Sequence, residues 1–150
     1  MDQIYTHPKR KTKVVFVQLG SPSEPTTKAL RKYLRKFLGD PRVVDINPWL
    51  WKIILNFFVL PFRPKKSAKL YARIWDGKSF PLITNTRDFT NNVREELKKI
   101  DPNGNVEVNH AFLLSPPYVN EVYDSWENDL KKGIGATKLL VIPMFPQYSE

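Results

Sequence analysis

The stretch from Val14 to Gly20 reads VVFVQLG, and it decides the fold class of this chain. A continuous apolar run of this length is typical of a strand that is buried on both faces, as in the middle of a parallel sheet. Gly20 and Pro22 then predict a loop at the carboxyl end of that strand. The stretch therefore predicts a parallel sheet that is covered by helices on both faces.

Helix-like and strand-like patterns alternate through the rest of the chain. Residues 26–38 carry an apolar stripe with a four-residue repeat, which predicts an amphipathic helix that Gly39 ends. Further helices are predicted over 49–60 (ended by Pro61), 67–75, 86–100 and 119–132, and further strands over 106–112 and 138–145. This order predicts an α/β fold with a doubly wound parallel sheet. We expect a polar, basic tail over 1–11 and an α/β domain over 12–150.

Ligands of such folds bind beyond the carboxyl ends of the strands. The segments to examine for function are therefore 18–25, 113–118 and 144–150. The turn at Gly20-Ser21-Pro22 has neither the spacing of a dinucleotide-binding loop nor the lysine of a Walker loop.

Composition narrows the classes of function. The 150 residues carry a formal net charge of +9, which favours an anionic partner such as nucleic acid, a phospholipid surface or an acidic small molecule, or else a solvated basic surface. The chain has no cysteine, which excludes a disulfide or an iron–sulfur cluster built from these residues. The first 13 residues lack the apolar run of a secretory signal. The apolar run over 48–62 is shorter than the ~20 residues of a spanning helix.

Few residues have the character of catalytic groups. His7 lies in the basic tail, and His110 lies in a predicted strand, where a histidine is usually a core residue with its hydrogen bonds satisfied. Ser21 lacks the surroundings of a nucleophilic serine. The residues by themselves predict no catalytic set and no metal site.

Four blocks, in this order, resemble the ferrochelatases: VQLGSP at 17–22, YLRKFLGDPRVVD at 33–45, the stretch from Pro61 through KLYARIW at 69–75, and VIPMFPQYS at 141–149. On these blocks the chain is identified as a member of that family, corresponding to its amino-terminal half. The resemblance implies the class II chelatase fold, in which two similar α/β domains enclose a porphyrin cleft, and this chain would supply the first domain.

The resemblance also implies a reaction and a site. The family inserts ferrous iron into a porphyrin, protoporphyrin IX or a coproporphyrin, in haem biosynthesis; iron is a substrate and no cofactor is firmly bound. The implied partners are a porphyrin, ferrous iron and, through peripheral contact, an anionic membrane. No nucleic acid partner is expected. The implied location is the cytoplasm or the inner face of the membrane. The implied porphyrin contacts are Leu19, Arg63, Tyr71 and Ser79, and the implied hydrophobic lip is Tyr33, Leu34, Phe37 and Leu38.

Three departures from the family pattern leave alternatives open. Ser79 lies in KSFPL, where the family has GSPL, and residues 112–117 read FLLSPP, where many members have an Arg-Tyr or Ser-Tyr pair. Neither His7 nor His110 lies on the family's catalytic histidine motif, which we expect beyond Glu150, so we expect this segment alone to be inactive. The alternatives are a non-catalytic porphyrin- or haem-binding module and a basic module that binds a membrane surface.

Overall fold

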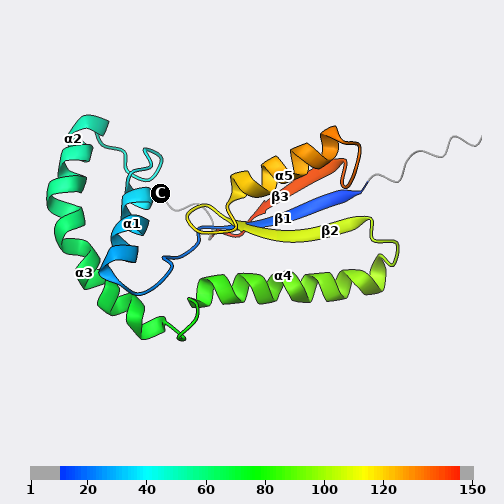
Figure 1. Ribbon diagram of the computed structural model, residues 1–150, viewed down its shortest axis with the longest axis horizontal. Coiled ribbons are helices and arrows are strands. Elements are labelled where there is room, and N and C mark those ends of the chain that lie inside the picture. Colours follow the sequence, from blue (N-terminus) through cyan, green and yellow to red (C-terminus); the bar gives the residue numbers. More distant parts are fainter. Residues whose placement is uncertain (1–10, 146–150) are drawn as a thin grey trace, which may run out of the picture. The chain divides into compact units, whose positions relative to one another are not determined.

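The computed structural model describes residues 11–145, which form two compact units. Of the described residues, one unit combines 11–18 with 86–145, and the other is Leu19–Asn85. The elements follow in the order β1 (Thr12–Gln18), α1 (Thr27–Leu38), α2 (Pro48–Ile54), the π-helical turn η1 (Leu55–Val59), α3 (Leu60–Tyr71), the 3-10 turn η2 (Ala72–Ile74), α4 (Pro81–Ile100), β2 (Val106–Phe112), α5 (Val119–Lys131) and β3 (Lys138–Pro143) (Figure 1).

The first unit is a three-stranded parallel sheet in the order β2-β1-β3. Helices α4 and α5 lie on opposite faces of this sheet (Figure 1). On the α4 face the ring of Phe16 packs edge-on against Phe89, with 5.0 Å between the ring centroids. On the α5 face the buried core consists of Val15, Val17 and Ala111, against which Val119 and Val122 pack. The predicted fold class, a parallel sheet with helices on both faces, is confirmed.

Neighbouring groups bind three of the outward backbone groups at the free edge of β2. Every second residue of an edge strand turns its backbone groups outward, where another strand could pair with them. The outward N–H of Val106 donates to the carboxylate of Asp101 (2.9 Å), and the outward carbonyl of Val108 accepts from Nε of Arg94 (2.7 Å). The N–H of Phe112 donates to the carbonyl of Pro117 (2.8 Å).

The second unit is built on α1 and the helical run that follows it. Thr26 caps α1, because its hydroxyl accepts from the N–H of Ala29 at 3.2 Å. The apolar stripe that the sequence predicts is buried at Leu30, Tyr33 and Leu34, and α1 packs against α3.

The helical run does not end at Pro61, so this prediction was wrong. Residues 48–71 form α2, η1 and α3 in direct succession, and the helix predicted over 67–75 is the end of α3 followed by η2. Proline is tolerated near the start of a helical segment, and Pro61 is the second residue of α3, just after the wider π turn. The N–H of Leu60 donates to the carbonyl of Leu55, five residues back, which keeps both buried leucines on one side of the run.

The remaining differences concern element ends. Helix α4 begins at Pro81, five residues earlier than predicted, and β3 ends at Pro143 instead of residue 145. Strand β2 has the predicted bounds. Most of the predicted tail, residues 1–10, lies outside the described residues. Within 11–145, none of the helices has both the length and the apolar character needed to cross a membrane.

Candidate functional site

Five aromatic rings of the second unit form a continuous chain of contacts. Tyr33 stacks with Phe37 one turn later in α1 (6.2 Å between centroids) and lies 6.4 Å from Tyr71 at the end of α3. Tyr71 in turn meets the edge of Phe80 at 5.4 Å, and Phe80 lies 4.6 Å from Trp75. Phe80 is only 2% exposed. The contacts bring together three residues that the resemblance selects: Tyr33, Phe37 and Tyr71.

The hydroxyl of Tyr33 is buried and hydrogen-bonded. It donates to the carbonyl of Gly20 at 3.3 Å, which ties α1 to the loop after β1. Gly20 has a φ of 93°, a conformation that glycine adopts without strain. Burial raises the pKa of Tyr33 far above its usual value, and the neighbouring Tyr71 adds to that rise. Tyr33 therefore stays protonated and acts as a hydrogen-bond donor.

Arg63 lies on α3 and is exposed. It is eight residues before Tyr71, which is about two turns or ~12 Å along the helix axis. Tyr71 itself is partly exposed, so part of its surface remains open beside the ring contacts. Helix α3 thus presents a guanidinium and an aromatic ring along one element.

Ser79 lies in a tight turn that Asp76 organises. The carboxylate of Asp76 accepts from the N–H groups of Lys78 (2.7 Å) and Ser79 (2.5 Å), and the N–H of Asp76 donates to the carbonyl of Ser79 at 3.3 Å. These backbone bonds, the one from Ser79 first, hold the pKa of Asp76 below its usual value. Ser79 directly precedes Phe80, so the turn also positions the ring that supports Tyr71.

The other predicted site residues differ in exposure. Leu19 is half-buried where the chain leaves β1, and Leu34 is buried in the core of its unit. Phe37 and Leu38 of the predicted lip are half-exposed. The carbonyl of Leu38 accepts from the indole N–H of Trp51 at 2.6 Å, which fixes the end of α1 against α2.

Residues 112–117, which read FLLSPP, begin at the last residue of β2. Phe112 is fully buried, whereas Leu113 is 45% exposed. The N–H of Leu113 donates to the carbonyl of Gln18 at 3.1 Å, and the side-chain amide of Gln18 donates to the carbonyl of Met144 at 2.9 Å. The carboxyl ends of the three strands are thereby tied together.

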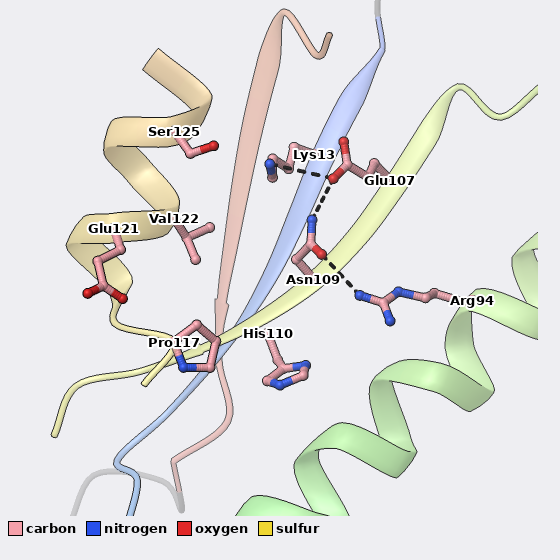
Figure 2. A pocket seen from close by; sticks show the side chains of 9 residues that line it. All are labelled: Lys13, Arg94, Glu107, Asn109, His110, Pro117, Glu121, Val122 and Ser125. Atoms are coloured by element: carbon pink, nitrogen blue, oxygen red, sulfur yellow. Dashed lines mark hydrogen bonds and ion pairs between the residues drawn. The ribbon is translucent and has the colours of Figure 1, made fainter. Parts of the chain in front are cut away.

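The first unit also contains a hollow that sequence reasoning did not select. It has a volume of about 360 Å³ and lies around the edge of β2, between α4 and α5 (Figure 2). Its lining residues are Lys13, Arg94, Glu107, Asn109, His110, Pro117, Glu121, Val122 and Ser125. The register of β1 against β2 places Lys13 beside Glu107, but no pattern in the sequence indicates that Arg94 reaches this edge from α4.

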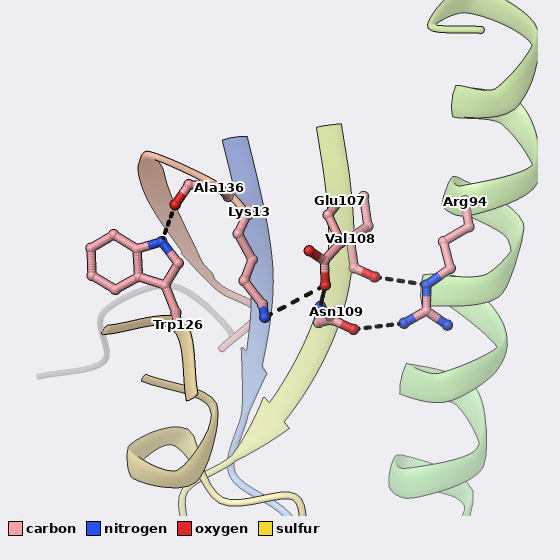
Figure 3. A network of polar contacts seen from close by, with 7 residues as sticks. All are labelled: Lys13, Arg94, Glu107, Val108, Asn109, Trp126 and Ala136. Carbon is pink, nitrogen blue, oxygen red and sulfur yellow. Dashed lines mark hydrogen bonds and ion pairs between the residues drawn. The ribbon is translucent and has the colours of Figure 1, made fainter. Parts of the chain in front are cut away.

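A polar network crosses this hollow (Figure 3). Lys13 pairs with Glu107 (3.5 Å), Glu107 accepts from the amide of Asn109 (2.6 Å), and Asn109 accepts from Arg94 (3.0 Å). These groups bind one another, so the network holds the edge of the sheet together. We therefore assign it a structural role.

His110 is half-buried beside this network, with its ring 5.6 Å from that of Phe112. Its Nδ1 is buried and has no hydrogen-bond partner among the described residues. The prediction of a core histidine with its hydrogen bonds satisfied was therefore wrong in this respect. Burial, then the charges of Arg94 and Arg87, lower the pKa of His110, which keeps the ring neutral near pH 7. Within residues 11–145 no cluster of three or more acidic, histidine or cysteine side chains could hold a metal ion.

Comparison with known proteins identifies the chain at family level. The model of the family described as ferrochelatase matches residues 11–150. The chain belongs to the ferrochelatase family. It is similar to the ferrochelatase of Idiomarina loihiensis, with 41% identity over 136 residues, 91% of this chain and 36% of that protein. It is 42% identical over 138 residues to the ferrochelatase of Psychrobacter arcticus, with 91% and 38% covered.

A third relative, the ferrochelatase of Francisella tularensis subsp. tularensis, is 36% identical over 150 residues, 98% of this chain and 41% of that protein. The chain therefore spans about two fifths of the length of these relatives. The parallel sheet flanked by α4 and α5 agrees with the first domain expected for a ferrochelatase.

Proposed function

We propose that this segment forms one half of the porphyrin cleft of a ferrochelatase, which inserts ferrous iron into a porphyrin in haem biosynthesis. The observation that carries the proposal is the arrangement on α3. Arg63 is exposed about two turns from Tyr71, and Tyr71 belongs to a chain of five aromatic rings. A porphyrin is a flat apolar disc with carboxylate groups at its edge. Aromatic rings suit its face, and a guanidinium suits a propionate.

In this proposal the residues bind and orient the porphyrin. Arg63 pairs with a propionate, Tyr71 packs on the macrocycle, and Leu19 and the exposed parts of Phe37 and Leu38 complete the apolar wall. Ser79 contributes a polar contact from the turn at Asp76. Two protons leave the porphyrin as ferrous iron enters. The base that accepts them is the family's catalytic histidine, on a motif that neither His7 nor His110 matches.

A chimera tests this proposal. Residues 1–150 replace the matching segment of the Idiomarina loihiensis ferrochelatase, and metalloporphyrin formation from protoporphyrin IX and ferrous or zinc ion is followed by absorbance and fluorescence. We expect turnover by the chimera, and porphyrin binding without turnover by residues 1–150 alone. Arg63→Ala should lower kcat/KM about tenfold, because a charge-assisted pair with a propionate is lost.

Arg35→Ala is the matched control, since Arg35 is also an exposed arginine in the same unit. A folded chimera that binds porphyrin but inserts no metal would favour the non-catalytic porphyrin-binding module. Equal losses in the two arginine variants would remove Arg63 from the site. Metalloporphyrin formation by residues 1–150 at an enzymatic rate would contradict the predicted inactivity.

A second function, contact with an anionic membrane, is favoured by one surface of the helical run. Four aromatic side chains of α2, η1 and α3 are largely exposed: Trp49 (77%), Phe57 (69%), Phe58 (66%) and Phe62 (72%). Exposed lysines occur in the same run, at Lys52, Lys65, Lys66 and Lys69. Aromatic residues insert into the interface of a bilayer, and lysines are attracted to anionic headgroups. In this proposal the protein works in the cytoplasm and contacts the membrane peripherally through this surface.

Co-sedimentation with phosphatidylserine vesicles tests the membrane contact. Phe62→Ala should weaken binding about tenfold, because burial of a phenylalanine side chain contributes ~1.5–3 kcal/mol. Ile100→Ala, at a residue of α4 that is 78% exposed, should leave binding unchanged. Binding that is equally strong to neutral vesicles, or that survives high salt, would argue against an electrostatic contribution.

A further inference from the structure

Pro64 interrupts the hydrogen bonding of α3 from within. In an α-helix the N–H of each residue donates to the carbonyl four residues earlier, and proline has no N–H to donate. Pro64 lies inside α3, so the carbonyl of Leu60 lacks the N–H at residue 64 that would be its ordinary partner. Leu60 is only 2% exposed. A buried carbonyl without a partner is costly, which makes the group that replaces the missing donor structurally important.

Arg31 of α1 supplies the missing donor. Its Nε donates to the carbonyl of Leu60 at 3.3 Å, across the interface between α1 and α3. The donor is charged, which makes such a bond stronger than one between neutral groups. Leu30, the neighbour of Arg31, is fully buried, so this part of α1 is held in place.

The carboxyl end of α1 is held in a similar way. The carbonyl of Leu38 belongs to the last turn of α1, where carbonyls lack partners within the helix, and it accepts from the indole N–H of Trp51. Side chains therefore donate to two carbonyls that lack their ordinary helical donor, one because of a proline and one because the helix ends. Together they fix α1 along the helical run.

We propose that Arg31 is a positioning residue that sets the place of the porphyrin-contacting face of α3. The inference rests on the proposed function, in which Arg63 and Tyr71 contact the porphyrin. Arg63 is the residue next to Pro64, and Tyr71 packs against Tyr33 of the same helix α1 that carries Arg31. Loss of the bond to Leu60 frees α3 at the proline and displaces Arg63 relative to Tyr71.

A proline substitution separates this role from a direct contact between Arg31 and the porphyrin. Pro64→Ala restores an N–H at residue 64, and the carbonyl of Leu60 then has its ordinary helical partner. If Arg31 acts through Leu60, Arg31→Met should be harmful with Pro64 present and nearly neutral with alanine there. If Arg31 binds a propionate itself, Pro64→Ala cannot rescue its loss.

The experiment compares the 150-residue chain with Arg31→Met, Pro64→Ala and the double variant. Protoporphyrin IX affinity is measured by Soret titration well below the lowest melting temperature, and urea unfolding is measured in parallel. We expect Arg31→Met to weaken porphyrin binding about tenfold and the double variant to return to within about twofold of Pro64→Ala. Arg35→Met controls for the lost charge and should change neither readout.

Each outcome decides something different. Affinity that remains low in the double variant overturns the positioning role and assigns Arg31 to direct contact. Unchanged affinity in Arg31→Met overturns it as well. If the wild-type chain binds no porphyrin, the proposed function itself fails. The unfolding data then still show whether the effects of Arg31 and Pro64 on stability are coupled.

Discussion

Replacement of Phe80 by alanine should destabilise the unit that contains α1 and α3 and loosen Tyr71. Phe80 is 2% exposed and its ring contacts both Tyr71 and Trp75. Phe→Ala in a core costs about 3–5 kcal/mol, and aromatic pairs contribute ~0.5–1.5 kcal/mol each within such totals. Proteins of this kind unfold at a cost of about 5–15 kcal/mol, so the loss is a large share of the stability.

Urea unfolding followed by tryptophan fluorescence measures this change, because Trp75 lies 4.6 Å from Phe80. The matched control is Phe62→Ala, which removes the same side chain from a position that is 72% exposed and should change stability by no more than about 0.5 kcal/mol. Phe80→Leu keeps most of the volume and should cost less than ~1.5 kcal/mol, which covers the case in which Phe80→Ala does not fold.

Porphyrin affinity should follow the same order, with Phe80→Ala weakest, because Tyr71 loses the ring that supports it. The reasoning is refuted if Phe80→Ala and Phe62→Ala lower the free energy of unfolding by similar amounts. It is also refuted if Phe80→Ala costs less than about 1 kcal/mol, since a cavity of that size would then have closed without strain.

Two further predictions concern the first unit. The pKa of His110 is lower in the folded state, so the unfolded chain binds a proton that the folded chain excludes, and the free energy of unfolding should decrease as the pH falls below about 6.5. We expect His110→Leu to make the urea midpoint depend less on pH between pH 7.5 and 5. An unchanged slope in this variant would contradict the prediction. Trp126→Phe should lower the free energy of unfolding by about 1–3 kcal/mol, because the carbonyl of the buried Ala136 loses the indole N–H that donates to it at 2.9 Å. The control Trp49→Phe, at an exposed position, should leave the unfolding curve unchanged.

The sheet could be predicted from the sequence because its signals are local. The continuous apolar run at Val14–Leu19 is typical of a strand that is buried on both faces, and the alternation over 106–112 follows from the two-residue period of a strand. Helix α1 could be predicted for the same reason, because its apolar stripe, its N-cap at Thr26 and its end at Gly39 all follow from residues within or next to the helix. Parallel strands are joined by crossover connections, so α4 and α5, which lie in the connections between the strands, are expected to cover the faces of the sheet.

The error at Pro61 has a physical cause. Proline is tolerated in the first turn of a helix, and after the π turn at Leu55–Val59 a new α-helical segment begins in which Pro61 is the second residue. Such a turn is set by the packing of Leu55 and Leu60 against the rest of the unit, and no local pattern specifies it.

The candidate site could be predicted only in part. The resemblance selected Tyr33, Phe37 and Tyr71, but Phe80 and Trp75 join them only through a turn that Asp76 organises. No sequence pattern predicts the hydrogen bond from Arg31 to the carbonyl of Leu60 either. An exposed arginine on a basic helix is indistinguishable from its neighbours until the carbonyl that it satisfies is known.

The hydrogen-bonded groups at the edge of β2 limit how this sheet can be enlarged. Asp101, Arg94 and Pro117 occupy the positions at which another strand would begin, continue and finish its ladder on that side. An additional strand, from this protein or from another molecule, would have to replace these three bonds before it could pair along β2.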